Sequence, residues 1–168
     1  MSLIVEIGTG SATAESYISV TDAGTYHTNR GNTAWAALLN DTVREQCLRK
    51  ATEYMDAAYH SRWQGVKAFV LVQALDWPRS DVIVDGVGVD YNSIPEAIKR
   101  ACAELALRAS SAALLDDQTQ GVVREQVGPI AVEYERNSPQ ATRYKAIDAI
   151  LAPFLKSGGG CSVGLVRT

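Results

Sequence analysis

The sequence predicts a mainly α-helical protein: a small bundle of three long helices and several short ones, with β-hairpin projections and an extended N-terminal arm. Three observations support this fold class. Apolar residues recur at helical spacing in three long segments, two segments rich in β-branched residues lie between them, and a short apolar run stands alone at the N-terminus. The chain has 168 residues, 46% of them hydrophobic, which is enough for one domain that buries its own core.

Residues 1–16 are expected to form the N-terminal arm. The apolar run from Leu3 to Ile7 is followed mainly by Gly, Ser, Thr and Ala. A run this short cannot bury its apolar side chains alone, so we expect it to pair with a partner, such as a strand of a neighbouring chain. Residues 17–156 then form a single helical domain, and residues 157–168 form a flexible glycine-rich tail.

Two short helices are predicted at the start of this domain. Ser19 and Asp22 have the spacing of a capping box, which opens a helix that runs to about Arg30 and stops at Gly31. A second helical segment begins at Trp35 and ends near residue 40.

Capping signals and apolar stripes predict the first long helix and the last. Thr42 and Glu45 form a second capping box, which opens a helix over residues 42–59. The last long helix follows Pro139 and ends before the glycines at 158–160. The residues expected to face inward are Val43, Cys47, Ala51, Tyr54 and Ala58 in the first, and Tyr144, Ile147, Ile150, Leu151 and Leu155 in the last.

The middle long helix has the strongest start signal in the chain. Ser93 is the predicted N-cap, Pro95 lies in the first turn and Glu96 is at the third position. Its inward face is expected to hold Ile94, Ile98, Ala101, Cys102, Leu105, Ala109 and Ala112. Several of these side chains are alanines, which permit a close approach of neighbouring helices.

Two hairpins are predicted to project from the helices. Residues 82–89 place an Asp85-Gly86 turn between β-branched residues, and residues 122–135 form two strands bent at Gly128-Pro129. In the second strand of the latter, the apolar face holds Ile130, Val132 and Tyr134. A hairpin alone is marginally stable in water, so we expect both to rest on something outside the monomer.

The sequence offers no catalytic, cofactor or metal site. His27 and His60 are far apart and belong to no metal-binding pattern, so both are expected to be surface or capping residues. Gly8-Thr9-Gly10 begins like a phosphate-binding loop, but no basic residue lies near it, which favours a flexible arm. We therefore expect no enzymatic activity and no cofactor.

Charge disfavours tight binding of nucleic acid. The net charge is −3, and the basic residues are scattered rather than clustered. The nearest match to a nucleic-acid-binding pattern is Arg62-Trp63-Gln64-Gly65-Val66-Lys67, where an aromatic residue lies between two basic ones. No uncharged stretch is long enough to span a membrane and no signal peptide is recognisable, so the expected product is intracellular, soluble and without membrane contact.

One local cluster, Trp77-Pro78-Arg79, stands out between the hairpins and the helices. Pro78 holds Trp77 in an extended backbone, and Arg79 is expected to reach a carboxylate or a helix C-terminus. The cluster is either a structural corner that fixes a loop to the long helices or an interface anchor, since Trp and Arg dominate binding hot spots.

At this cluster the sequence resembles the tailed-phage head–tail connector (adaptor) proteins, over about residues 16–156. Related phage proteins are also labelled DnaT-like single-stranded DNA-binding proteins. The segments that carry the resemblance are Ser16-Tyr17-Ile18-Ser19-Val20, residues 48–56, Gln73-Ala74-Leu75-Asp76-Trp77-Pro78-Arg79, Ile94-Pro95-Glu96-Ala97-Ile98-Lys99-Arg100-Ala101, Glu104-Leu105-Ala106, Val127-Gly128-Pro129-Ile130 with Val132-Glu133-Tyr134, Ile147-Asp148 and Ala152-Pro153-Phe154-Leu155.

The resemblance implies a structural protein of the virion, made in the cytoplasm of the bacterial host. It would assemble with itself into a ring of about twelve subunits beneath the portal protein, next to a head-closure or tail-completion protein. DNA would pass through the ring without being recognised. The residues expected at interfaces are Trp77, Pro78, Arg79, Ile94, Pro95, Gly128, Ile130, Val132 and Tyr134. Single-stranded DNA binding is the alternative function, and an enzyme or an unrelated interaction module is the third.

Overall fold

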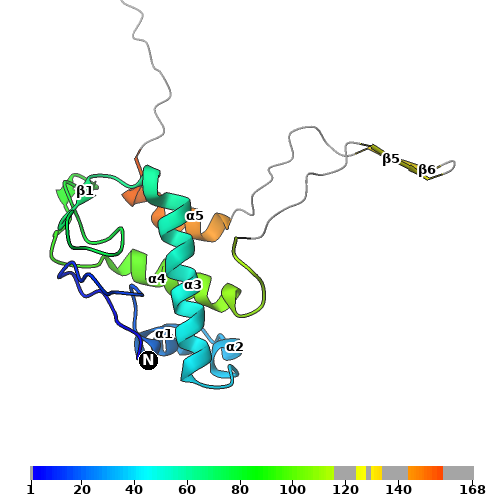
Figure 1. Cartoon of the computed structure of the whole chain (residues 1–168), viewed down its shortest axis with the longest axis horizontal. Coiled ribbons are helices and arrows are strands. Elements are labelled where there is room, and N and C mark those ends of the chain that lie inside the picture. The colour runs from blue at the N-terminus through cyan, green and yellow to red at the C-terminus, as the bar shows by residue number, and fades with distance from the viewer. Residues whose placement is uncertain (1, 116–123, 128–129, 134–143, 157–168) are drawn as a thin grey trace, which may run out of the picture.

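The computed structural model describes residues 2–115, 124–127, 130–133 and 144–156, and it is mainly helical, as predicted (Figure 1). The long helix α3 (Asp41–Tyr59) runs through the body and packs against α4 (Glu96–Ala109), which in turn packs against α5 (Lys145–Leu151). The remaining helices are α1 (Val20–Thr28), α2 (Thr33–Ala36), and the 3-10 turns η1 (His60–Arg62) and η2 (Ala152–Phe154).

Side chains buried between these helices form a single core. Leu48 and Met55 of α3 face Ile98 and Leu105 of α4, and all four are fully enclosed. The small residues of α4, among them Ala101 and Cys102, are also fully buried, which is consistent with the predicted close approach of neighbouring helices. Burying this apolar surface is the main force that holds the helices together.

The helix starts agree with the sequence only in part. Ser19 caps α1 by accepting a hydrogen bond from the Asp22 backbone N–H, as predicted. For α3 the predicted cap at Thr42 is wrong: Asn40 accepts from the Val43 N–H at 3.0 Å, because its short amide side chain already satisfies that donor.

The bounds of the other two long helices also differ. Ser93 does not cap α4; its hydroxyl donates to the Asp90 carbonyl, and regular helix starts only after Pro95. At its other end α4 stops at Ala109, because the carbonyls of the last turn accept from Ser110 and its neighbours in a tighter turn, and Ala112 is exposed. The last helix, α5, has 7 residues, and the predicted start after Pro139 lies outside the described residues.

Both predicted hairpins are present. Strands β3 (Ile83–Val84) and β4 (Val87–Gly88) pair around Asp85 and Gly86, whose φ angles of 52° and 81° fit the turn that Asp-Gly favours. Strands β5 (Arg124–Val127) and β6 (Ile130–Glu133) form the second antiparallel pair, which Figure 1 draws apart from the helices. A third pair, β1 (Val66–Lys67) with β2 (Arg79–Ser80), was not predicted, and the segment between these two strands consists of turns rather than helix.

The N-terminal segment folds back onto its own chain instead of extending toward a partner. Val5 bridges Ser16, and the buried Glu6 carboxylate accepts hydrogen bonds from four successive backbone N–H groups, Gly8 to Ser11, at 2.7–3.1 Å. The Gly8-Thr9-Gly10 loop is therefore wrapped around a carboxylate of its own chain. The bridge and this carboxylate hold the run against its own chain, while Ile4 and Ile7 stay 44% and 71% exposed.

None of the helices in the described part of the chain is both long enough and apolar enough to cross a membrane.

Candidate functional site

The Trp77-Pro78-Arg79 cluster is a buried structural corner. The Trp77 ring is fully enclosed and packs edge-on against Trp63 and Phe154, with ring centroids 5.6 and 5.7 Å apart. The Trp77–Pro78 peptide is cis, and Pro78 is buried as well. Because the Trp77 side chain is not exposed in the described structure, this residue is part of a structural corner and is not available to anchor an interface.

Arg79 fixes the same corner through the backbone. Its guanidinium donates to the carbonyls of Gln64, Gly65 and Asp76 at 2.7, 2.8 and 3.2 Å. The predicted contact with a carboxylate or a helix end is therefore wrong, because these loop carbonyls lie closer and supply three acceptors. Burial lowers the Arg79 pKa from its usual value.

A network of polar groups joins this corner to α3. The Tyr17 hydroxyl accepts from the backbone N–H groups of Asp76 and Trp77, at 3.0 and 3.3 Å, and donates to the Asp56 carboxylate. Burial raises the Asp56 pKa to about 7 and the Tyr17 pKa well above its usual value. The buried Asp76 carboxylate pairs with the exposed His60 ring at 2.8 Å and with Lys67 at 3.4 Å.

The remaining predicted interface residues do not gather at one place in the described structure. Ile94 is buried and Pro95 is half-buried at the start of α4. Ile130 and Val132 lie in β6, where only the backbone is described, and Gly128 and Tyr134 lie outside the described residues.

Two further residues that the sequence singled out, Trp63 and His27, are buried. Trp63 is fully buried, so the segment from Arg62 to Lys67 has no ring on which a base could stack. His27, expected to be a surface or capping residue, is instead buried: its ring bonds the Ala103 carbonyl at 3.1 Å and packs on Trp35.

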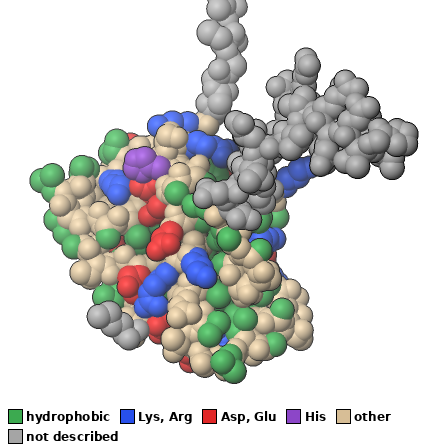
Figure 2. Space-filling model, turned by 45° about the vertical axis from the view of Figure 1, so that its right-hand side comes forward, with side chains coloured by type: hydrophobic (Ala, Val, Ile, Leu, Met, Phe, Trp, Pro, Cys, Tyr) green, Lys and Arg blue, Asp and Glu red, His purple; other side chains and the backbone are tan. Residues whose placement is uncertain are grey.

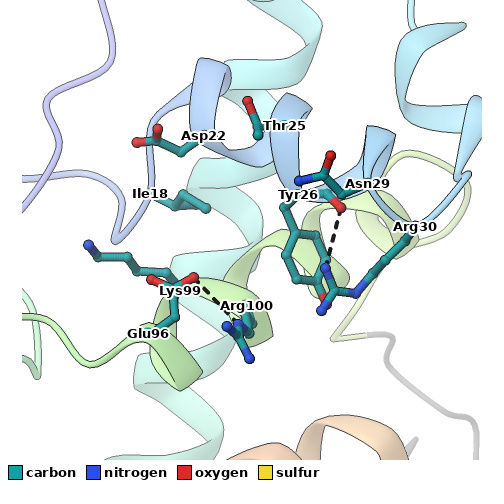
Figure 3. Close-up of a pocket in the computed structure, with 9 residues that line it drawn as sticks. All are labelled: Ile18, Asp22, Thr25, Tyr26, Asn29, Arg30, Glu96, Lys99 and Arg100. Carbon is teal, nitrogen blue, oxygen red and sulfur yellow. Dashed lines mark hydrogen bonds and ion pairs between the residues drawn. The ribbon is translucent and has the colours of Figure 1, made fainter.

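A groove between α1 and α4 does bring basic and aromatic side chains together (Figure 3). It has a volume of about 370 Å³. One wall comes from α1 and the residues that follow it, and the other from the first turns of α4. The lining residues are Ile18, Asp22, Thr25, Tyr26, Asn29, Arg30, Glu96, Lys99 and Arg100.

The α1 wall holds a stacked pair. The Arg30 guanidinium lies over the Tyr26 ring, 3.7 Å from its centroid, and donates to the Tyr26 carbonyl at 3.4 Å. The Tyr26 hydroxyl donates to Glu104 at 3.1 Å. Burial of the ring, together with the charge of Glu104 and this bond, raises the Tyr26 pKa. Arg108 holds Glu104 in turn at 2.8 Å, so the ring has a fixed position.

The α4 wall supplies the other two cations. Arg100 pairs with Glu96 at 3.4 Å, one turn earlier in the helix, whereas Lys99 forms no hydrogen bond or ion pair with any described residue. With Asp22, the groove holds three basic and two acidic side chains. It is thus slightly positive on a chain whose net charge is −3, while Figure 2 shows acidic and basic side chains mixed over the face it displays.

A second surface is apolar. The segments 66–72 and 83–88, on either side of the buried corner, are together called the apolar projection below. Leu71, in the turns that follow β1, is 97% exposed, and hydrophobic side chains lie at the left edge of Figure 2. The other large apolar side chains that the projection exposes are Val66, Val70, Val72, Ile83 and Val87.

The sequence does contain the residues of the groove at recognisable spacings, but the acidic net charge of the chain argues against a basic site. Tyr26 and Arg30 are four residues apart, the spacing at which helical side chains meet, and Lys99-Arg100 is a basic pair one turn after a predicted helix start. Only the packing of α1 against α4 brings the two pairs to one groove. Among the described residues, no group of His, Cys, Asp and Glu side chains could hold a metal ion.

A family model described as "Putative DnaT-like ssDNA binding protein" matches residues 1–168, the whole chain. No curated protein matches the chain significantly, and no solved structure does.

Proposed function

Because the chain belongs to the DnaT-like ssDNA-binding family, we propose that it binds single-stranded DNA, through the groove between α1 and α4. It acts by binding and catalyses no reaction. The observation that carries the proposal is the Arg30–Tyr26 stack on one wall, with Lys99 and Arg100 on the other. Proteins that bind single strands combine cationic grooves with planar groups on which bases stack.

The charge balance limits the affinity. Two of the three cations have partners in the groove or beside it, and neighbouring carboxylates repel phosphate. We therefore expect a dissociation constant of about 10⁻⁴ to 10⁻⁶ M at physiological salt. With phosphate contacts from Lys99 and Arg100, raising the salt from about 50 to 200 mM should weaken binding about 7-fold.

The test is fluorescence anisotropy of a labelled oligothymidylate at several salt concentrations. Lys99→Ala should weaken binding and make the slope of log K against log salt less negative by about 0.7, the value for one lost phosphate contact on a single strand. Lys145→Ala, which removes an exposed lysine of α5 outside the groove, is the matched control and should bind like the wild type. Equal loss in both variants, or no binding by the wild type, contradicts the proposal.

A second candidate function is the head–tail connector, and the apolar projection favours it. Exposed apolar side chains beside paired strands are typical of assembly surfaces, because water disfavours them. In this function the projection contacts the next subunit of a ring beneath a portal protein, in a virion, and DNA passes through the ring without being recognised.

Sedimentation velocity over a concentration series tests this candidate. A connector should form a closed oligomer that Leu71→Asp dissociates, whereas Leu39→Asp should leave it intact. Leu39 is the matched control because it is equally apolar, 86% exposed, and lies outside the projection. A wild type that stays monomeric at all concentrations argues against self-assembly through the projection.

A further inference from the structure

We infer that the Arg30 guanidinium is the surface on which an unpaired base stacks, and that Lys99 and Arg100 bind the phosphate beside that base. This inference rests on the proposed function and assigns its contacts. The Arg30 guanidinium lies over the Tyr26 ring, and Arg30 itself is exposed and lines the groove. The side of the guanidinium away from the ring is therefore left for a ligand. Planar guanidinium groups stack on bases as aromatic rings do.

Arg30, and not the Tyr26 ring, is the contact surface for the base. The guanidinium lies over one face of the ring, 3.7 Å from its centroid, and His27 makes an edge contact with the ring at a centroid distance of 5.2 Å. The ring thus supports the guanidinium from below. A base that stacked on Tyr26 directly would have to displace Arg30 and break its bond to the Tyr26 carbonyl.

The stack is already in place before a ligand binds. Arg108 holds Glu104, Glu104 accepts from the Tyr26 hydroxyl, and Tyr26 supports Arg30. Because this chain of contacts orders the platform beforehand, little side-chain entropy is lost on binding.

The opposite wall is suited to a phosphate. Lys99 has no partner among the described residues, and Arg100 is held only by an exposed pair with Glu96, an interaction that contributes little. A phosphate between these side chains leaves its own base directed at the α1 wall. Bases in a duplex are stacked on both sides, so the platform favours a single strand.

Two probes separate stacking from charge: an oligothymidylate and an abasic oligonucleotide of the same length, which carries the same phosphates without bases. Wild-type protein should bind the first about 5- to 20-fold more tightly than the second, the lower part of the range expected for one stacked base. In Arg30→Lys, which keeps the charge and loses the planar group, this ratio should fall to about 1, with the salt slope unchanged.

The matched control is Arg62→Lys, since Arg62 also lies over a tyrosine ring, Tyr59, at 5.0 Å but outside the groove. It should keep the wild-type ratio. If Arg30→Lys also keeps the ratio while oligonucleotides still bind, the stacking assignment is wrong and the proposed function stands. If neither probe binds the wild type, the proposed function is wrong and this inference falls with it.

Discussion

At the scale of single residues, the Tyr17 hydroxyl connects three parts of the chain. It donates to Asp56 of α3 and accepts from the backbone of Asp76 and Trp77, so one phenol ties the Trp77-Pro78-Arg79 corner to α3. Arg79 completes the corner from the other side by bonding three carbonyls. Nothing in the spacing of these residues predicts the contacts, because they depend on segments that are far apart in the sequence.

The Trp77 ring should be the side chain whose loss costs most in this corner. It is fully buried among aromatic rings, so Trp77→Ala should lower the free energy of unfolding by about 3–5 kcal/mol. Trp77→Phe is the control: the indole N–H has no hydrogen-bond partner in the described structure, so the smaller ring should cost far less. Urea denaturation of both variants measures the difference, and a Trp77→Ala protein as stable as the wild type would show that the ring is not buried.

Asp56 should make stability depend on pH. Its pKa is about 7 in the folded protein and close to 3.8 when unfolded, so the folded state binds the proton more tightly. The stabilisation linked to this proton is fully present below about pH 4 and is lost as the pH rises through 7. Asp56→Asn should therefore flatten the decline in unfolding free energy between pH 4 and 7. Urea melts across this range measure it, and an unchanged pH profile in the variant would contradict the assignment.

At the scale of the elements, the N-terminal segment shows most clearly which structure local sequence patterns do not predict. Apolar periodicity identified the helices, and the Asp85-Gly86 turn identified a hairpin, because both are local signals. The fold of residues 2–16 depends on Glu6 meeting four N–H groups, and that of β1–β2 on pairing across an intervening loop. The groove likewise depends on two distant segments, because α1 and its flanking residues form one wall and α4 forms the other.

Glu6 should hold the N-terminal segment in place. Glu6→Ala leaves four backbone donors without their carboxylate, which should lower the free energy of unfolding by about 3 kcal/mol. Glu15→Ala is the control, because its carboxylate pairs with Arg49 at the surface and its loss should cost far less than that of Glu6. Thermal melts of both variants give the comparison. If the two melt alike, the Glu6 carboxylate is not what organises the loop.

At the scale of the whole molecule, two surfaces of different chemistry stand on one helical body. The groove between α1 and α4 is slightly basic and holds a planar cation, whereas the apolar projection exposes large aliphatic side chains. On the proposed function phosphate binds in the groove, while the exposed apolar side chains of the projection are all uncharged. The family match concerns the whole chain and does not choose between the two surfaces, so the choice depends on where DNA binds.

Titration of isotope-labelled protein with an oligothymidylate, followed by NMR chemical shifts, locates that contact directly. The proposed function predicts that the largest changes gather at Tyr26 to Arg30 and at Glu96 to Arg100, and that added salt reverses them. Shifts confined to the apolar projection, or none at all at millimolar oligonucleotide, would contradict the claim that the groove between α1 and α4 binds single-stranded DNA.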